Sequence, residues 1–352
     1  MKLNKRVVTF LLVLLFALGA ELSSAKEKDK DIGHSPYPPT CSTEPHYGKG
    51  LALALDGNFA EARTEFEAGL KRSTSKNSCK NALTNLLELT NDAIDKNVKK
   101  EAAIHIFKGR EFDDKDMIEK SIAQYSLAIK IDPAYPEAYN VRGGAYDEDE
   151  KYDLAIADFN KAMELDPKNA DAYYNRGKIR DYKGKSTLAI TDFDRAIELD
   201  PDHASSFFSR AFIYYGKGHF DLAIADFNKA VEIEPEYAYA YGMRGSIYSQ
   251  KGQYDHAIAD LTKAAELDPE MASIYTIRAT IYYKMGQPNT AIADYSKAIE
   301  IDPMLTHAYS GRGYIYIMGL GDRKSGCRDL KKACELGLCK TYEESKSRGN
   351  CK

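Results

Sequence analysis

The sequence predicts an all-α fold in which one pair of antiparallel helices is repeated and stacked along the chain. The main observation is a fixed period, because acid–proline pairs recur every 34 residues without insertion or deletion. These pairs are Asp132-Pro133, Asp166-Pro167, Asp200-Pro201, Glu234-Pro235, Asp268-Pro269 and Asp302-Pro303. A period of this length is typical of a unit that cannot bury its apolar face alone and buries it against its neighbours.

Each unit has the pattern of two helices separated by a tight turn. In the unit that starts at Pro136, apolar and small residues recur at helical spacing over 138–146 and again over 155–162. In the four units that follow, glycine in the segments KGKS, KGHF, KGQY and MGQP gives the backbone the freedom that a turn needs. Proline then ends the second helix, because the residue before a proline is steered away from the α region.

Small and large residues recur at fixed offsets within these units. The small residues of the first helix are Gly143, Gly177, Ala211, Gly245, Ala279 and Gly313. The second helix carries Ala155, Ala189, Ala223, Ala257 and Ala291, each followed by a large residue: Phe159, Phe193, Phe227, Leu261 and Tyr295. With these residues the units resemble tetratricopeptide repeats. One departure is Arg180, because the other units have tyrosine there.

The resemblance implies a tetratricopeptide repeat solenoid, a right-handed superhelix of stacked antiparallel helix pairs with disulfide-stapled ends. Residues 136–305 form five regular units, and residues 306–352 form a terminal repeat with a cysteine-rich cap. Residues 102–135 fit a degenerate repeat, and residues 43–101 fit another degenerate repeat followed by a helix over Asn81 to Glu101. Small residues let the helices approach closely, and the ring of the facing residue fills the space.

The N-terminus has the pattern of an export signal. Basic residues in MKLNKR precede an apolar run from Val7 to Ala20, which is shorter than a membrane span. We expect residues 1–25 to be a cleaved signal peptide, with an uncleaved membrane anchor facing the periplasm as the alternative. Residues 26–42 are charged and then proline-rich, which is typical of a disordered leader. The expected location is therefore periplasmic or secreted, with no membrane span after cleavage.

The six cysteines lie near the two ends of the chain, and an even number in an exported chain indicates three disulfides. Cys41 and Cys79 bracket the first repeat and are the expected N-terminal pair. Cys327 and Cys334 are seven residues apart on one predicted helix, which is too far for a bond between them. Two connectivities remain, and we favour Cys327–Cys351 with Cys334–Cys339. A zinc site is the alternative, but the spacings lack a close CxxC pair.

No residue pattern indicates catalysis. The seven histidines are scattered through different units, and the sequence has no GxSxG, HExxH or glycine-rich phosphate loop. The acids of the segment Asp147-Glu148-Asp149-Glu150 fall in a predicted turn and are expected to be solvated. We therefore expect no enzyme activity, no cofactor and no metal. The formal net charge of −4 also argues against a nucleic-acid partner.

Every regular unit carries an arginine in its first helix and an aspartate in its second. The pairs are Arg142 and Asp158, Arg176 and Asp192, Arg210 and Asp226, Arg244 and Asp260, Arg278 and Asp294, and Arg312 and Asp329. The arginines could form a track for an anionic ligand. Equal numbers at constant spacing favour a structural ladder of ion pairs between the two helices of each unit.

In the tetratricopeptide repeat family, partners bind along the inner face of the first helices. The corresponding positions in this chain are Asn140, Tyr174, Asn175, Lys178, Phe208, Phe212, Tyr215, Tyr239, Tyr283 and Tyr314. They predict an aromatic groove with few charges, suited to an extended peptide. The alternative is that several of these rings only pack against neighbouring helices.

The expected function is an exported interaction module that binds a peptide or protein on this inner face, as an adaptor or assembly factor. One alternative is a structural scaffold of the cell envelope that associates with itself through edge or cap surfaces. Another is a glycan-binding protein whose tyrosine and phenylalanine rings stack on sugars. The sequence does not specify the partner or the oligomeric state.

Overall fold

The computed structural model describes residues 45–72 and 80–351, and these residues form helices and connecting turns with no strand. They divide into two compact units, here called the N-terminal unit (45–213) and the C-terminal unit (214–351). Residues 1–44, which hold the expected signal peptide and leader, lie outside the described part. So do Cys41 and Cys79, and their expected bond stays a prediction.

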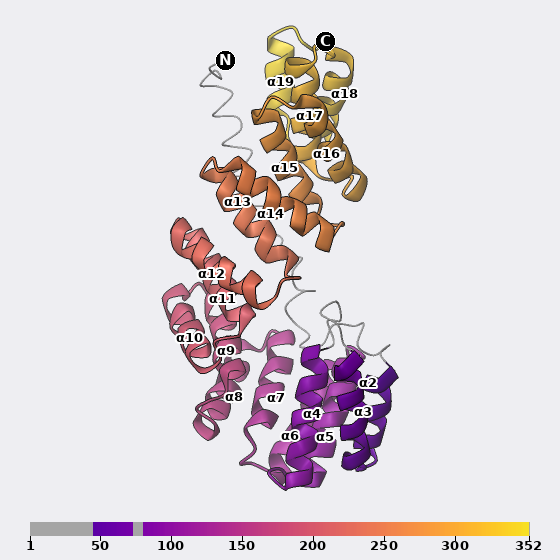
Figure 1. Ribbon diagram of the computed structural model, residues 1–352, viewed down its shortest axis with the longest axis vertical. Helices are drawn as coiled ribbons and strands as arrows, with labels where there is room; N and C mark the ends of the chain where they lie inside the picture. The colour runs from indigo at the N-terminus through magenta and orange to yellow at the C-terminus, as the bar shows by residue number, and fades with distance from the viewer. Residues whose placement is uncertain (1–44, 73–79, 352) are drawn as a thin grey trace. The chain divides into compact units, whose positions relative to one another are not determined.

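In the N-terminal unit, consecutive helices pair antiparallel and the pairs stack side by side (Figure 1). The helices are α2 (Pro45–Leu55), α3 (Phe59–Arg72), α4 (Lys80–Asp95), α5 (Lys100–Asp113), α6 (Ile118–Ile131), α7 (Pro136–Glu148), α8 (Tyr152–Leu165), α9 (Ala170–Tyr182), α10 (Ser186–Leu199) and α11 (Ala204–Gly216), the last of which runs past the end of this unit.

The C-terminal unit continues the same alternation of first and second helices. Its helices are α12 (Phe220–Ile233), α13 (Ala238–Gln250), α14 (Tyr254–Leu267), α15 (Ala272–Lys284), α16 (Pro288–Ile301), α17 (Thr306–Gly319), α18 (Arg323–Glu335) and α19 (Lys340–Ser347). The predicted all-α repeat architecture is thus confirmed within each unit. No helix in the described residues is long and apolar enough to cross a membrane.

The helix expected over Asn81 to Glu101 is shorter than the sequence indicated. It ends at Asp95, because the backbone at Lys96 turns into the left-handed region with φ 63°. A new helix, α5, then begins at Lys100 and pairs with α6. The apolar spacing continues across this turn, so periodicity alone did not reveal the break.

In four of the acid–proline pairs, the aspartate caps the turn that follows a second helix. The carboxylate of Asp166 accepts a hydrogen bond from the backbone N–H of Lys168 at 2.9 Å, two residues on. Asp200, Asp268 and Asp302 make the same contact with the second residue after them. This Asx turn satisfies a backbone donor at the helix end, so the acid has a local structural role that the proline alone does not explain.

Aromatic rings fill the space between the two helices of a repeat, and glycine makes the close approach possible. A Cβ atom added at Gly143 would lie 2.7 Å from the ring of Phe159, and one at Gly109 would lie 2.2 Å from the ring of Tyr125. Both rings are fully buried. The small residues in the first helices are therefore required by contact with these rings.

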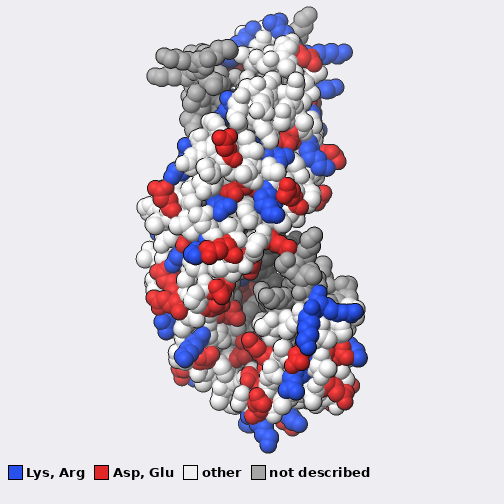
Figure 2. Space-filling model, in the orientation of Figure 1, with Lys and Arg blue, Asp and Glu red and all other residues white. Residues whose placement is uncertain are grey.

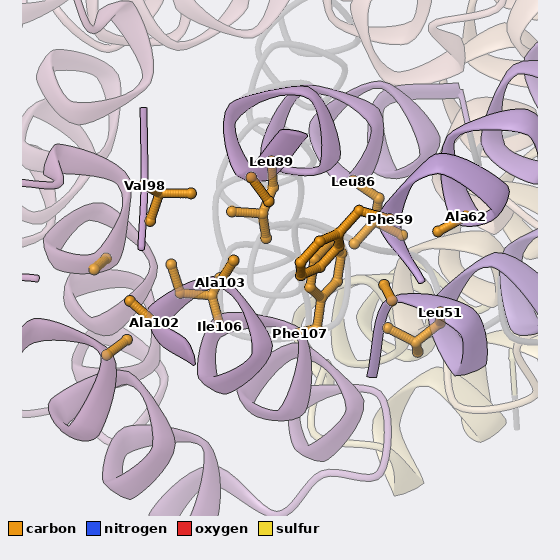
Figure 3. Close-up of a cluster of buried hydrophobic side chains, with 14 of the residues drawn as sticks. Leu51, Phe59, Ala62, Leu86, Leu89, Val98, Ala102, Ala103, Ile106 and Phe107 are labelled. Carbon is orange, nitrogen blue, oxygen red and sulfur yellow. The ribbon is translucent and has the colours of Figure 1, made fainter. Parts of the chain in front are cut away.

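Helices α3, α4 and α5 share one apolar core although the repeats in this part of the chain are irregular. Phe59 of α3 and Phe107 of α5 stack with ring centroids 6.1 Å apart. Leu86 and Leu89 of α4 and Ile106 of α5 are buried in the same cluster (Figure 3). The described residues of the irregular segment 45–131 thus contribute to a buried apolar core.

Candidate functional site

The predicted arginine–aspartate ladder lies between the two helices of each repeat. In five repeats of the described residues the guanidinium group binds both carboxylate oxygens of its aspartate. The shortest contacts are 2.7 Å for Arg142–Asp158, 2.6 Å for Arg176–Asp192, and 2.7 Å each for Arg244–Asp260, Arg278–Asp294 and Arg312–Asp329. The hydrogen bond to Asp158 raises the pKa of Arg142 above its ordinary value. Arg210 and Asp226 belong to different units, and their predicted pairing stays a prediction.

Each ladder arginine also bonds to the second helix of the preceding repeat, a feature that the sequence reasoning missed. Arg142 donates to Ser126 Oγ at 3.1 Å, and Arg176 donates to Asn160 Oδ1 at 2.6 Å. The other four ladder arginines donate to Asp194, Asn228, Thr262 and Ser296. We call these six acceptor residues the acceptor row. The sequence does carry a signal for these acceptors, because a polar residue recurs every 34 positions, two residues after the ladder aspartate. The ladder therefore joins neighbouring repeats as well as the helices within one.

The unusual Arg180 joins the ladder. Its guanidinium group donates to Asp192 Oδ2 at 2.7 Å, so Asp192 is bound by two arginines, Arg176 and Arg180. In the preceding repeat the same position holds Tyr146, whose ring lies 5.7 Å from the guanidinium of Arg142. Both the tyrosine and the arginine thus contact the ladder, the first through its ring and the second through its charge.

The N-terminal unit holds the first group of predicted binding residues. Asn140 is buried, with its Nδ2 donating to Glu137 Oε2 at 3.2 Å and its Oδ1 without a hydrogen-bond partner. Tyr174 packs against the ring of His203 at 4.9 Å, and Lys178 lies 5.7 Å above the same tyrosine ring. Asn175, Phe208 and Phe212 are half-buried.

In the C-terminal unit the predicted binding residues are aromatic and half-buried. Gln250 Nε2 donates to the hydroxyl of Tyr215 at 2.8 Å. Tyr283 and Tyr314 meet edge to face with ring centroids 6.1 Å apart, and burial raises the pKa of both hydroxyls. Tyr239 is also half-buried. These rings contact one another or a neighbouring helix and still present part of their surface to solvent.

Aspartates lie near the ends of first helices in the N-terminal unit, at a position where later repeats carry predicted binding residues. Asp113, Asp147 and Asp181 recur every 34 residues, and in the next repeats the same position holds Tyr215 and later Tyr283. All three aspartates are half-buried at the ends of their first helices. We call these three residues the aspartate row. The prediction used this position for Tyr215 and Tyr283 but not in the repeats before them, and the row was therefore missed.

Carboxylates crowd together around the aspartate row. Burial, together with the charges of Asp113 and Asp147, raises the pKa of Glu148 to about 8, while Lys178 opposes the shift. Burial also raises the pKa of Asp113 to about 6. The segment 147–150 is thus not simply solvated, because α7 extends to Glu148 and residues 147–149 are half-buried. Carboxylates at a helix C-terminus also face the negative end of the helix dipole, so this arrangement favours a bound cation.

A second group of carboxylates lies near Asn140. Arg110 is almost fully buried and donates to Glu137 Oε1 at 2.8 Å. Burial raises the pKa of Glu137 and of Glu88, and the charge of Asp171 raises both further. Carboxylates on α4, α7 and α9 therefore interact around a single arginine. Figure 2 shows acidic side chains, in red, gathered over α7, α8 and α9.

The described residues offer little for metal binding or catalysis. They contain no group of three or more histidine, cysteine or acidic side chains that could hold a metal ion. One hollow, of about 450 Å³, lies over α17 and α18, and another, of about 260 Å³, lies beside Lys151 and Lys183. Neither of these two hollows brings a nucleophile beside a general base.

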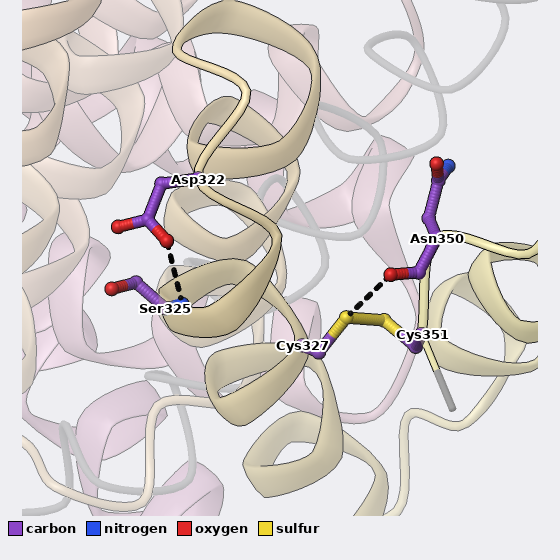
Figure 4. Close-up of a disulfide and its surroundings, with 5 residues drawn as sticks. All are labelled: Asp322, Ser325, Cys327, Asn350 and Cys351. Carbon is purple, nitrogen blue, oxygen red and sulfur yellow. Dashed lines mark hydrogen bonds between the residues drawn. A yellow bond between two sulfur atoms is a disulfide. The ribbon is translucent and has the colours of Figure 1, made fainter.

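The C-terminal cap is closed by two disulfides, Cys327–Cys351 and Cys334–Cys339, the connectivity favoured from the sequence. Figure 4 shows the first of these joining α18 to the chain after α19. The side chain of Asp322 caps α18 by accepting the backbone N–H of Ser325 at 3.1 Å. The Cys327–Cys351 bond thus ties the end of the chain to the last full helix pair.

Family comparisons agree with this geometry. Models described as "TPR repeat" match residues 143–180 and 245–286, and models described as "Tetratricopeptide repeat" match residues 170–203, 204–237, 227–259 and 272–305. No curated protein matches the chain.

Solved structures similar to this chain are also tetratricopeptide repeat proteins. PilF from Pseudomonas aeruginosa is 19% identical, with a TM-score of 0.54, over 62% of this chain and 98% of that one. The C-terminal part of a TPR repeat-containing protein from Cytophaga hutchinsonii is 22% identical, with a TM-score of 0.53, over 67% and 97%. YrrB, described as a TPR protein with an unusual peptide-binding site, is 23% identical, with a TM-score of 0.46, over 52% and 95%.

Repeats of this type form protein-interaction scaffolds and are not typically enzymes. The sequence period, the helix pairs and the family matches agree on one assignment. Residues 143–305 of the chain are tetratricopeptide repeats.

Proposed function

We propose that this protein is an exported interaction module, acting as an adaptor or assembly factor. It holds a lysine- or arginine-bearing segment of a protein partner along the inner face of the N-terminal unit. The observation that carries this proposal is the aspartate row, Asp113, Asp147 and Asp181, together with the raised pKa values of Asp113 and Glu148 beside it.

Charge crowding explains why a basic segment would bind there. Lys178 Nζ lies 3.8 Å from Asp147, while the charges of Asp113, Asp116 and Asp147 all raise the pKa of Glu148. A bound lysine or arginine would relieve this repulsion and would be held by charge-assisted hydrogen bonds.

A buried polar atom on the same face supports a peptide ligand. The Oδ1 atom of Asn140 is an acceptor without a hydrogen-bond partner, although this side chain is only 8% exposed. An unmet acceptor in a buried position costs free energy unless a donor reaches it. An N–H group of a bound segment is such a donor.

The aromatic residues of the C-terminal unit give the module a second kind of contact. Tyr283 and Tyr314 form an edge-to-face pair and remain half-buried. Rings with a polar tip are well suited to a polypeptide, because they offer apolar area and a hydrogen-bonding group. We place them as contacts for uncharged parts of a partner.

Export is supported by the sequence pattern before residue 26 and by the disulfides of the cap. Disulfides persist in oxidising compartments and are rare in the reducing cytosol. A periplasmic or secreted location follows, and detection of the processed protein in those fractions tests it.

Removing charge from the aspartate row should weaken binding of a basic peptide. The test compares the unaltered protein with Asp147→Asn/Asp181→Asn, using an extended peptide of alternating lysine and serine in a calorimetric titration. We expect affinity to fall about tenfold or more, because each charge-assisted hydrogen bond contributes roughly 1.5–3 kcal/mol. We also expect the affinity of the unaltered protein to fall as salt is raised.

A matched control is Glu61→Gln/Glu101→Gln, which removes two exposed acids of α3 and α5. This variant should bind like the unaltered protein. Equal weakening in both variants would show a general charge effect and remove the proposed site. Loss of binding only in Tyr283→Ala/Tyr314→Ala would assign the peptide to the aromatic residues instead.

A further inference from the structure

The C-terminal cap presents a cationic surface that the proposed function does not use. Residues 323–348 contain eight lysines and arginines against four acids. On α18, Arg323, Lys324, Arg328 and Lys331 are exposed. Figure 2 shows basic side chains, in blue, at this end of the C-terminal unit.

The acids of α18 neutralise little of this charge. Asp329 is buried, and both of its carboxylate oxygens are bound by Arg312. Glu335 lies 4.0 Å from Lys332 Nζ at the surface, where an ion pair is weak. The hollow of about 450 Å³ lies here, lined by Tyr309, Arg312, Arg328, Lys331 and Lys332 among others.

Lys331 marks this surface as the end of the repeat stack. It stands two residues after the ladder aspartate, where earlier second helices present the acceptor row, such as Ser296 two residues after Asp294. A further repeat of the same kind would bring its ladder arginine to this point and meet a lysine. The like charges of the arginine and Lys331 would repel. The surface therefore disfavours the stacking of another repeat and favours binding of carboxylates.

The same chain carries the complementary charge. Residues 45–213 hold 30 acidic residues against 25 basic ones, and the aspartate row is crowded with carboxylates whose pKa values are raised. We propose that the cationic cap of one copy binds the aspartate row of a second copy. This inference rests on the proposed function, because it takes the row as an acceptor of cationic polypeptide and names the cap as one such ligand.

Contact between two different surfaces has a definite consequence for assembly. When the cap of one copy binds the aspartate row of a second copy, the first copy still has an unoccupied row and the second an unoccupied cap. Further copies can therefore add head to tail, and the assembly does not stop at a symmetric dimer. The assembly should grow with protein concentration and dissociate as salt is raised, because opposite charges hold it together.

The test measures molar mass by light scattering and sedimentation for the full chain purified with its disulfides intact. We expect the unaltered protein to form a concentration-dependent series of oligomers. The cap variant Arg328→Glu/Lys331→Glu and the row variant Asp147→Lys/Asp181→Lys should each be monomeric. Lys217→Glu/Lys263→Glu carries the same charge change on exposed lysines of the C-terminal unit and should assemble normally.

Mixing the two monomeric variants is the sharpest step. The cap variant keeps an intact row and the row variant keeps an intact cap, and the reversed cap of the first is complementary to the reversed row of the second. The mixture should therefore assemble although each variant alone is monomeric. A variant with all four substitutions should assemble again, because both charges are reversed. A monomeric unaltered protein at roughly 100 μM, a concentration that detects even weak interfaces, would overturn the inference. So would a mixture that stays monomeric.

The outcomes separate this inference from the proposed function. If the lysine peptide binds the row while the protein stays monomeric, only self-association is wrong. If oligomers persist in the row variant and the peptide does not bind, the row is not an acceptor and both proposals fail. Binding of the monomeric protein to anionic lipid vesicles, abolished in the cap variant, would assign the cap to a membrane surface and also overturn the inference.

Discussion

Replacing Asp192 with alanine should lower the free energy of unfolding by about 3–5 kcal/mol, the cost of leaving one side of a buried ion pair without its partner. Asp192 is only 2% exposed and is bound by both Arg176 and Arg180. Its loss leaves two guanidinium groups between the helices without their carboxylate. Chemical denaturation followed by circular dichroism measures the change.

Two further variants isolate the cause. Asp158→Ala removes a carboxylate that binds one ladder arginine, Arg142, and should cost less than Asp192→Ala. Arg180→Tyr restores the residue found in the other regular repeats, and adding it to Asp192→Ala should recover part of the loss. Affinity for the lysine peptide should stay close to that of the unaltered protein in Asp158→Ala. If peptide affinity falls while stability holds, the arginines form a ligand track instead of a structural ladder.

The stability of the N-terminal unit should fall as pH rises, and Glu148→Gln should remove much of that fall. The folded state raises the pKa of Glu148 from its ordinary 4.5 to about 8. Between those values the folded protein holds a proton that the unfolded chain has lost, so the free energy of unfolding decreases as pH increases. Burial beside Asp113, Asp116 and Asp147 is the cause, with Lys178 opposing it. We expect the substitution to add about 2–4 kcal/mol at pH 8.5 and little at pH 4.

The measurement is a set of denaturation curves from pH 4 to pH 9, with Glu101→Gln as the control because Glu101 is exposed on α5. The control should follow the unaltered protein at every pH. Peptide affinity should change in the opposite sense and rise toward pH 9, since ionised Glu148 attracts a cation more strongly. If stability is flat between pH 5 and pH 8 in the unaltered protein, Glu148 is ionised there and the carboxylates are not crowded.

The sequence predicted the repeat and the ladder because both depend on identical residues at a constant spacing. Arg142 and its equivalents never vary, and neither do the aspartates that they bind. The acceptor row was harder to detect, because serine, asparagine, aspartate and threonine alternate at its position. A guanidinium group needs only an oxygen there, so its partner can change from repeat to repeat.

The candidate site was predicted less well. Positions carried over from the family placed Asn140, Tyr174 and Lys178 on the inner face, and the structure gives them neighbours that the offsets did not include. Glu148 was expected to be solvated because the glycine turns of other repeats suggested a turn at this point. The turn lies where the glycines of the other repeats indicate it, because Glu150 takes up the left-handed conformation with φ 56° at the position that holds Gly184 in the next repeat. Glu148 is the last residue of α7 and is half-buried beside its neighbouring acids, which the position of the turn alone did not reveal.

The acceptor row has a consequence for how the chain unfolds. Each ladder arginine contacts its own repeat and the one before it, as Arg244 does with Asp260 and Asn228. In a linear array, cooperativity depends on the free energy of each junction relative to that of each repeat alone. The same arginine contributes to the free energy of its own repeat and to that of the junction with the repeat before it. Loss of its guanidinium group therefore weakens both together. Arg244→Leu would therefore create a boundary at which one melting transition separates into two.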